Sequence, residues 1–290
     1  MTAQPNPDHL HPKPGYRGRI APSPTGFLHL GHAMTFRTAQ ERARASNGTL
    51  LLRIEDLDGP RCKPEFVQAV YEDLPWFGLQ WDEGPDCGGA FGPYVQSQRR
   101  PHYLAAWEKL RAKGLIYPCR CSRRDILQSA AAPHAEDEEP VYPETCRPAE
   151  PRIPSQTSPG GVTWRFRVPK GVPMSFDDGR LGSQSAISGV DFGDFIIWRK
   201  DDLPAYQLAV VVDDAAMAIT EVVRGEDLLI STFRQLLLYD VLELNPPTFY
   251  HCPLIRDPNG VRLAKRHAAL SLRELRKQGG IPGHLLQEIE

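Results

Sequence analysis

The stretch YRGRIAPSPTGFLHLGHAMTFRTAQERARASNGTLLLRIED, residues 16–56, decides the fold class. Its opening, RGRIAPSP, is typical of a short strand that ends in a proline-rich turn, because proline cannot donate to a strand ladder. The next segment, Gly31–Ser46, has a helical composition, and Asn47 and Gly48 predict its end because both residues tolerate a left-handed cap. The apolar TLLLRIED that follows predicts a buried strand. Strand, helix and strand in this order predict a βαβ unit, and hence an α/β fold with a Rossmann-like parallel sheet.

The rest of the chain divides by composition into a β-rich middle and a return to α/β character. Helices are expected over Pro64–Leu79, Gln98–Lys113 and Phe233–Leu244, and after Leu270. Strands are expected in WRFRVP (164–169), VDFGDFIIWR (190–199), LAVVVDDAAMAIT (208–220) and EVVRGEDLL (221–229). The predicted organisation is a loose proline-rich tail (1–15), the first half of a Rossmann-like domain (16–110), an inserted α+β subdomain (111–204) and the second half of that domain (205–290).

Bulk composition fits a globular protein and excludes several classes. Hydrophobic residues make up 41% and charged residues 24% of the chain, and no apolar run approaches the roughly 20 residues of a membrane span. The first residues lack the basic and apolar regions of a signal peptide. We therefore expect a cytoplasmic protein, in which the six cysteines are thiols or metal ligands rather than disulfides.

Net charge leaves the question of a nucleic-acid partner open. The formal net charge is −2, and setting aside the four acidic residues 136–139 leaves +2 (−2 + 4). A nucleic acid would therefore have to be held by local basic patches rather than by the field of the whole molecule.

The tetrapeptide His29-Leu30-Gly31-His32 lies between the first expected strand and the first expected helix. This is where an α/β sheet binds nucleotides, because the amides and dipole of a helix N-terminus favour anions. Gly31 would let a base or ribose approach the backbone, and the two histidines could donate hydrogen bonds to phosphate oxygens. The alternative is two surface histidines in a turn, since four-residue motifs recur by chance.

Four blocks of the sequence together resemble glutamyl-tRNA synthetases, which are class I aminoacyl-tRNA synthetases. The blocks are RIAPSPTGFLHLGH (19–32), LRIEDLD (52–58), YQLAVVVDDAAMAITEVVRGEDLLISTFRQ (206–235) and RLAKR (262–266). The resemblance implies ATP binding by His29, Gly31, His32, Arg262 and Lys265, with His29, His32 and Lys265 catalytic. RLAKR departs from the family's KMSKS loop: Arg262 replaces its first lysine and Ala264 its serine, so one hydroxyl is lost while positive charge is kept.

The same resemblance implies a glutamate pocket. Its expected residues are Arg19, Ile20, Ala21, Pro22, Ser23, Glu55, Tyr206 and Arg224. Guanidinium groups suit carboxylates, so Arg19, Arg224 and the Tyr206 hydroxyl are expected at the side-chain carboxylate, and Glu55 with Ser23 near the α-amine. The alternative for Arg19 and Glu55 is a buried ion pair without a ligand. Catalysis would be positioning and electrostatics, because the carboxylate of glutamate itself attacks ATP, with Mg²⁺ on the ATP.

Cys119, Cys121 and Cys146 lie in the inserted region. Three thiolates and one further ligand would form a tetrahedral structural zinc site, whereas unrelated buried thiols are the alternative on spacing alone. His134 would be the orthodox fourth ligand. The resemblance extends to short glutamyl-queuosine tRNA(Asp) synthetases, whose zinc is bound by three cysteines and a tyrosine, and this implies Tyr142.

The chain stops about twenty residues after RLAKR, so we expect no anticodon-binding domain. The resemblance to the short enzymes then implies a monomer that activates L-glutamate with ATP without tRNA and transfers it to queuosine in tRNA(Asp). Two alternatives are a shortened glutamyl-tRNA synthetase that charges the acceptor end, and a catalytically retired nucleotide- or tRNA-binding module.

Overall fold

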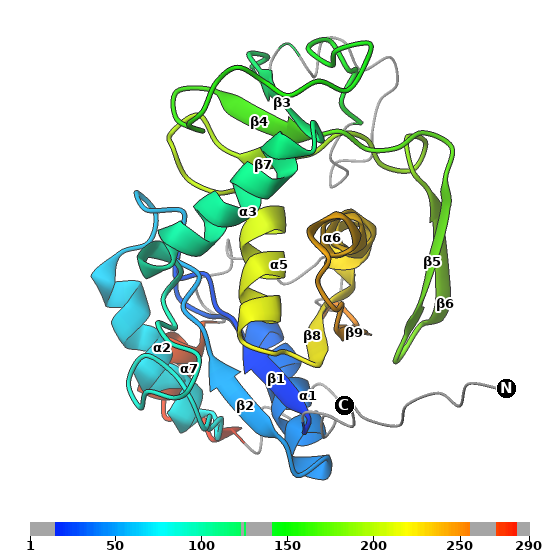
Figure 1. Cartoon of the computed structure of the whole chain (residues 1–290). Helices are drawn as coiled ribbons and strands as arrows, with labels where there is room; N and C mark the ends of the chain where they lie inside the picture. The colour runs from blue at the N-terminus through cyan, green and yellow to red at the C-terminus, as the bar shows by residue number, and fades with distance from the viewer. Residues whose placement is uncertain (1–14, 123–124, 126–140, 256–270, 283–290) are drawn as a thin grey trace, which may run out of the picture.

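The computed structural model describes residues 15–122, 125, 141–255 and 271–282 (Figure 1). Its principal helices in these ranges are α1 (Leu30–Ala45), α2 (Pro64–Trp76), α3 (Arg100–Ala112), α5 (Tyr206–Ala216), α6 (Leu229–Leu242) and α7 (Leu272–Lys277). Its strands there are β1 (Arg17–Ile20), β2 (Thr49–Leu52), β3 (Ile116–Cys119), β4 (Thr163–Phe166), β5 (Pro173–Asp178), β6 (Gly182–Ile187), β7 (Ile196–Trp198), β8 (Glu221–Gly225) and β9 (Thr248–Cys252).

The βαβ unit predicted at the start of the chain is β1–α1–β2. The two strands pair in parallel, and α1 ends where the sequence predicts. Asn47 adopts a left-handed φ of 47°, and a Cβ at Gly48 would lie only 2.5 Å from the carbonyl oxygen of Tyr16. The Asn-Gly pair is therefore needed to return the chain from α1 to β2.

A second set of strands comes from the other end of the sequence. Strands β8 and β9 pair in parallel, and β5 pairs with β9 in parallel while β6 runs antiparallel to β5. The two sets are joined because the Thr220 amide donates to the Arg17 carbonyl oxygen over 2.9 Å. The expected parallel arrangement is thus present, although the four-stranded sheet β6-β5-β9-β8 is mixed.

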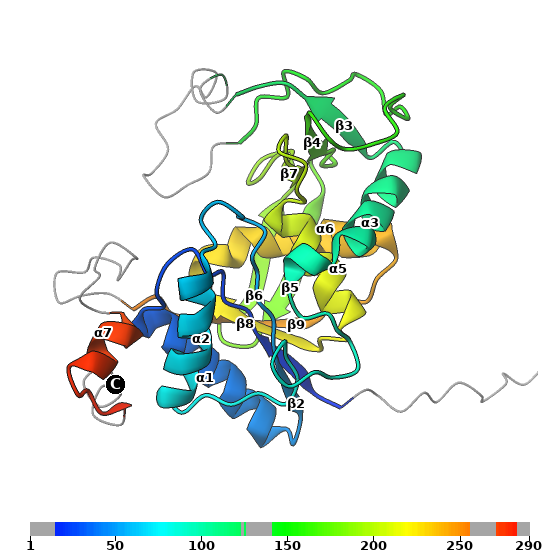
Figure 2. The ribbon, with the colours of Figure 1, turned by 90° about the vertical axis from the view of Figure 1, so that its left-hand side faces the viewer.

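The middle of the chain forms a separate antiparallel sheet in the order β3-β4-β7. Figure 2 shows this sheet at one end of the molecule, beyond α3. Its core is aromatic: Trp107 meets Trp164 edge to face with ring centroids 5.0 Å apart, and Trp198 is fully buried. Of the strand expected over 190–199, only the residues of β7, Ile196–Trp198, form a strand. The β5–β6 hairpin also comes from residues 111–204, but it is not part of this sheet. It pairs with β9 instead.

The prediction of a strand over Leu208–Thr220 is wrong, because this segment contains helix α5. A short continuous apolar run cannot separate a buried strand from a buried helix. Helix α5 lies between α3 and α6 (Figure 1), and its residues from Gln207 to Asp214 are all buried. The helix is buried on every side, which removes the amphipathic period that would have identified it.

No helix in the described part of the chain is long and apolar enough to span a bilayer.

Candidate functional site

A cleft of about 250 Å³ opens where the N-terminal half of the chain meets the C-terminal half. Ten of the predicted ATP- and glutamate-binding residues line it: Arg19, Ala21, Pro22, Ser23, His29, Gly31, His32, Glu55, Tyr206 and Arg224. Ile20 does not line the cleft, because its side chain is fully buried in the core. Arg262 and Lys265 lie outside the described residues.

The two histidines stand together at the N-terminus of α1. Their ring centroids are 3.7 Å apart, and the His29 amide donates to Nδ1 of His32 over 3.4 Å. This contact favours the tautomer of neutral His32 that carries its proton on Nε2. A Cβ at Gly31 would meet Cε1 of the His29 ring at 3.0 Å, so the glycine is needed for the packing of the histidine as well as for access to the backbone.

Arg19 and Glu55 face the cleft from neighbouring strands but do not form the simple ion pair considered above. Arg19 donates from Nη1 to the Val223 carbonyl oxygen over 2.8 Å, and its Nε lies 3.5 Å from a carboxylate oxygen of Asp214. Glu55 accepts from Arg53 through Oε1 alone, at 2.9 Å. Burial raises the pKa of Glu55, against the opposing charges of Arg53 and Arg19.

Beneath the cleft, three arginines and three carboxylates form a buried network. Arg53 contacts Asp214 at 2.7 Å and Glu55 at 2.9 Å, and Arg99 contacts Asp213 at 2.6 Å. Arg19 also contacts Asp214, so the network contains three positive and three negative side chains. Arg53, Asp213 and Asp214 were not among the residues predicted for the site. Two charged residues inside the apolar run of α5 were the signal that could have found them, because charges are buried only when they are paired.

Tyr206 and Arg224 meet from α5 and β8. Nη1 of Arg224 lies 3.4 Å from the Tyr206 hydroxyl and 2.8 Å from Oε1 of Gln235. Nη2 donates to the Thr232 hydroxyl over 2.7 Å, and Nε lies 3.3 Å from Nε2 of His251. Every one of these partners is uncharged or, for His251, favoured in its neutral form, since burial and the charge of Arg224 lower the pKa of this histidine.

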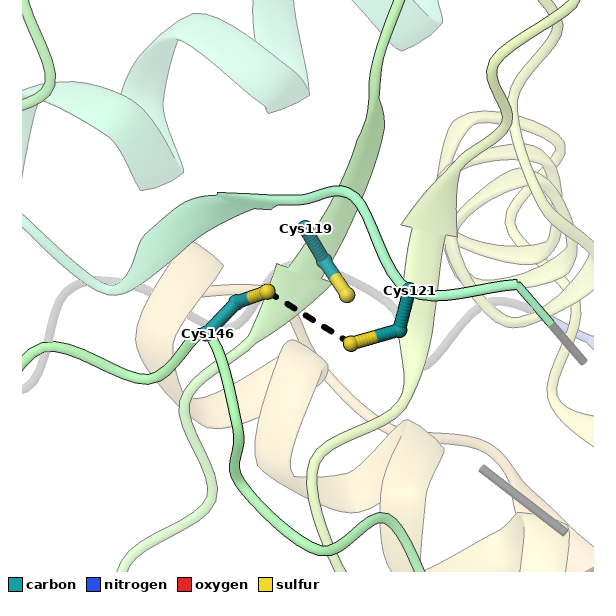
Figure 3. A group of neighbouring side chains, drawn as sticks. All are labelled: Cys119, Cys121 and Cys146. Carbon is teal, nitrogen blue, oxygen red and sulfur yellow. Dashed lines mark hydrogen bonds between the residues drawn. The ribbon is translucent and has the colours of Figure 1, made fainter. Parts of the chain in front are cut away.

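The cysteine cluster lies far from the cleft, beside the β3–β4–β7 sheet. Figure 3 shows the thiols of Cys119, Cys121 and Cys146 converging on one point. Their sulfurs lie within 4.8 Å of one another, and the Tyr142 hydroxyl lies 3.3 Å from Cys119 Sγ and 3.4 Å from Cys121 Sγ. His134 lies outside the described residues.

These distances fit a tetrahedral zinc ion. Zn–S bonds of about 2.3 Å place the sulfurs of a tetrahedron about 3.8 Å apart, and Cys121 Sγ and Cys146 Sγ are separated by 3.5 Å. Burial opposes ionisation of Cys146, but hydrogen bonds, led by that from the Arg120 backbone, lower the pKa of this thiol to about 7. Cys146 can therefore supply one of the thiolates that zinc requires, whereas burial raises the pKa of the Cys121 thiol, which zinc binding would have to deprotonate.

Comparison with known proteins gives concordant matches. The family model for tRNA synthetases class I (E and Q), catalytic domain, matches residues 16–290. The chain is 49% identical over 265 residues to the glutamyl-Q tRNA(Asp) synthetase of Nitratidesulfovibrio vulgaris, covering 91% of this chain and 82% of the relative. It is 46% identical over 275 residues to the protein of the same name from Symbiobacterium thermophilum, covering 92% and 84%.

A solved structure is similar over most of the chain. The glutamate tRNA ligase of Elizabethkingia meningosepticum, crystallised in complex with its amino acid, aligns with a TM-score of 0.74 and 31% sequence identity. The alignment covers 87% of this chain and 52% of the ligase, so the chain spans about half the length of that protein.

The buried network generates a stability prediction. Replacing Arg53 by methionine leaves Glu55 and Asp214 buried without their closest cation, so we expect the free energy of unfolding to fall by about 3–5 kcal/mol. Arg61→Met is the control: the Arg61 side chain is 72% exposed in its pair with Asp58, and such pairs contribute about 0–1 kcal/mol. Urea denaturation followed by circular dichroism measures both. Equal losses in the two variants would contradict the assigned role of the network.

Proposed function

Because the chain belongs to the class I tRNA synthetase family for glutamate and glutamine (E and Q), we propose that it activates L-glutamate with ATP and transfers the glutamyl group to queuosine at the wobble position of tRNA(Asp). The observation that carries this proposal is the identity of 45–49%, over about nine tenths of the chain, to three relatives named glutamyl-Q tRNA(Asp) synthetase. The geometry of the cleft supplies the physical support.

Arg224 supports the choice of an acidic amino acid. Arg224 is only 5% exposed, yet it forms no salt bridge with any residue in the described ranges. A buried guanidinium without a counter-charge is costly, and a ligand carboxylate that reached it would complete its electrostatics with charge-assisted hydrogen bonds. The side-chain carboxylate of glutamate, oriented also by the Tyr206 hydroxyl, fills this role.

Arg19 supports recognition of the side-chain carboxylate alongside Arg224, and Glu55 supports recognition of the α-amine. Within the described part of the chain, Nη2 of Arg19 and Oε2 of Glu55 have no hydrogen-bond partner, and both side chains line the cleft. The guanidinium suits a carboxylate and the carboxylate suits the α-amine. Ser23 lines the same cleft and can accept from the amine.

The nucleotide half of the proposal rests on the N-terminus of α1 and on the segment 256–270. Phosphate oxygens would meet the helix amides and the rings of His29 and His32. Both flanks of the segment that carries Arg262 and Lys265 are anchored at the cleft. Leu254 and Ile255 line it, and the Leu272 amide donates to the Leu28 carbonyl oxygen over 2.8 Å. These contacts at both flanks support a role for Arg262 and Lys265 in binding the phosphates of ATP, which would carry Mg²⁺.

The cysteine cluster supports a structural zinc ion held by Cys119, Cys121, Cys146 and Tyr142. The ion would order the chain around β3 and β4, where the strands are short. A cytoplasmic monomer is our proposal for the working form.

The decisive test separates base modification from acceptor charging. We expect glutamate-dependent ATP–pyrophosphate exchange without tRNA. We also expect incorporation of radiolabelled glutamate into queuosine-containing tRNA(Asp) but not into the queuosine-lacking transcript. Incorporation should survive enzymatic removal of the 3′ end of the tRNA. Equal labelling of both tRNAs, with loss of label after 3′ trimming, would instead identify an acceptor-charging enzyme, and an absence of exchange would identify a binding module.

Gly31 gives a matched pair of variants for the nucleotide site. Gly31→Ala must push the His29 ring away by a few tenths of an ångström, because the added Cβ would lie 3.0 Å from it. Since a 1 Å misplacement can cost about 100-fold in activity, this smaller one should cost up to about tenfold. We therefore expect the exchange rate to fall by about that factor, with KM for ATP raised more than KM for glutamate. Gly26→Ala is the control, because nothing lies within 4 Å of its added Cβ. A Gly31→Ala enzyme as active as the Gly26→Ala enzyme would contradict the assigned role of the motif.

Metal analysis tests the zinc site. The purified protein should contain about one zinc ion per chain by mass spectrometry, and Cys119→Ser should lose most of it because a thiolate ligand is removed. Cys252→Ser, at a buried thiol outside the cluster, should retain it. Tyr142→Phe should bind zinc more weakly. Zinc content that does not depend on Cys119 would rule out this site.

A further inference from the structure

Behind Arg224, away from the cleft, lies a histidine–aspartate pair that the proposed chemistry does not use. His251 on β9 and Asp178 at the end of β5 have fully buried side chains, and His251 Nδ1 lies 2.6 Å from Asp178 Oδ2. Neither residue lines the cleft. Because neither side chain can touch a ligand in the cleft, the pair can affect ligand binding only through a residue that it contacts. His251 contacts Arg224, which lines the cleft.

The surroundings of Asp178 determine where the protons are. Its Oδ1 accepts from the amides of Arg180 and Leu181 over 3.0 and 2.9 Å, and its Oδ2 accepts from the His251 amide over 3.1 Å. The remaining contact of Oδ2 is to Nδ1 of His251. A carboxylate with this many N–H donors is ionised, and these hydrogen bonds hold the pKa of Asp178 below its ordinary value despite burial. Nδ1 of His251 is therefore the protonated nitrogen.

The opposite nitrogen of the same ring is consequently an acceptor. Nε2 of His251 lies 3.3 Å from Nε of Arg224 and 3.1 Å from the Thr232 hydroxyl. The hydroxyl donates to Nε2 and accepts from Nη2 of Arg224 over 2.7 Å. His251 and Thr232 together hold one edge of the guanidinium, and Gln235 holds the other through Nη1.

The charges around His251 keep its ring neutral. Burial opposes a proton on it most strongly, Arg224 and Arg180 oppose one as well, and Asp178 favours one, so the pKa of His251 is lowered. The aromatic rings of Phe176 and Phe249 flank it with centroids 6.2 and 6.3 Å away. A protonated ring would direct an N–H at the Nε–H of Arg224 and break the contact.

We propose that His251, oriented by Asp178, is a positioning residue that aims the Arg224 guanidinium at the side-chain carboxylate of glutamate. The arrangement places the imidazole of His251 between the Asp178 carboxylate and Arg224. The guanidinium therefore retains its charge for the substrate, whereas a carboxylate in direct contact would compete with glutamate for it. This proposal rests on the proposed function and adds the residues that set its selectivity for an acidic side chain.

Two substitutions at one position test the proposal. An asparagine amide can occupy the place of Nδ1, and a glutamine amide that of Nε2. His251→Asn therefore keeps the contact with Asp178 and loses the acceptor for Arg224, whereas His251→Gln keeps that acceptor. Because a hydrogen bond to a charged group is lost, we expect His251→Asn to raise KM for glutamate about tenfold in ATP–pyrophosphate exchange, with KM for ATP and the melting temperature little changed. His251→Gln should recover most of the affinity.

Two outcomes would overturn the proposal. One is an unchanged KM for glutamate in His251→Asn, and another is a parallel loss of affinity for glutamate and ATP in both variants, which a merely structural role would produce. Failure of the proposed function is distinguishable, because the wild-type enzyme would then show no glutamate-dependent exchange at all.

A substrate-independent measurement tests the hydrogen-bond chain itself. Two-bond ¹⁵N–¹H correlation spectra of labelled protein should show His251, assigned by its absence in His251→Asn, as a neutral ring protonated on Nδ1 throughout pH 6–8. Asp178→Asn should change this pattern, because an amide cannot accept from all the donors that surround the carboxylate. A charged ring, or a proton on Nε2 of the wild type, would overturn the assignment.

Discussion

Arg53 is the residue on which the geometry of the cleft most depends. Its side chain is fully buried after β2 and contacts carboxylates from two directions, Glu55 on its own strand extension and Asp214 on α5. Removing such a cation would leave uncompensated charge in the core. The network fixes α5 against β2, and so holds Tyr206, at the start of α5, opposite the histidines at the start of α1.

The cleft uses charge in two different ways. Beneath it, Arg53, Asp213 and Asp214 are paired with one another and serve the fold. At its wall, Arg224 is surrounded by hydroxyl, amide and imidazole groups, so that its charge remains available to a ligand. The same residue types therefore have opposite roles, and their partners rather than their identities decide between them.

The part of the chain around the β3–β4–β7 sheet is stabilised by different means. The β3–β4–β7 sheet is small, and its core depends on the packing of Trp107, Trp164 and Trp198. Three thiols converge beside it (Figure 3), and the Tyr142 hydroxyl contacts two of them. A zinc ion bound there would connect β3 to the chain after residue 141. The β5–β6 hairpin carries Asp178 from this region back to β9, so the insertion also contributes to the wall behind Arg224.

The sequence by itself predicted the first βαβ unit, ten of the residues that line the cleft and the three cysteines that cluster. Prolines, the Asn-Gly pair and short motifs act through local geometry, and the likeness of four blocks to a known family gave the site residues. Only the tertiary structure decided that the run from Leu208 is a helix, because uniform burial erases periodicity. It alone brought Arg53 to Asp214 and His251 to Arg224, since contacts between residues far apart in the chain are set by packing and leave no local pattern.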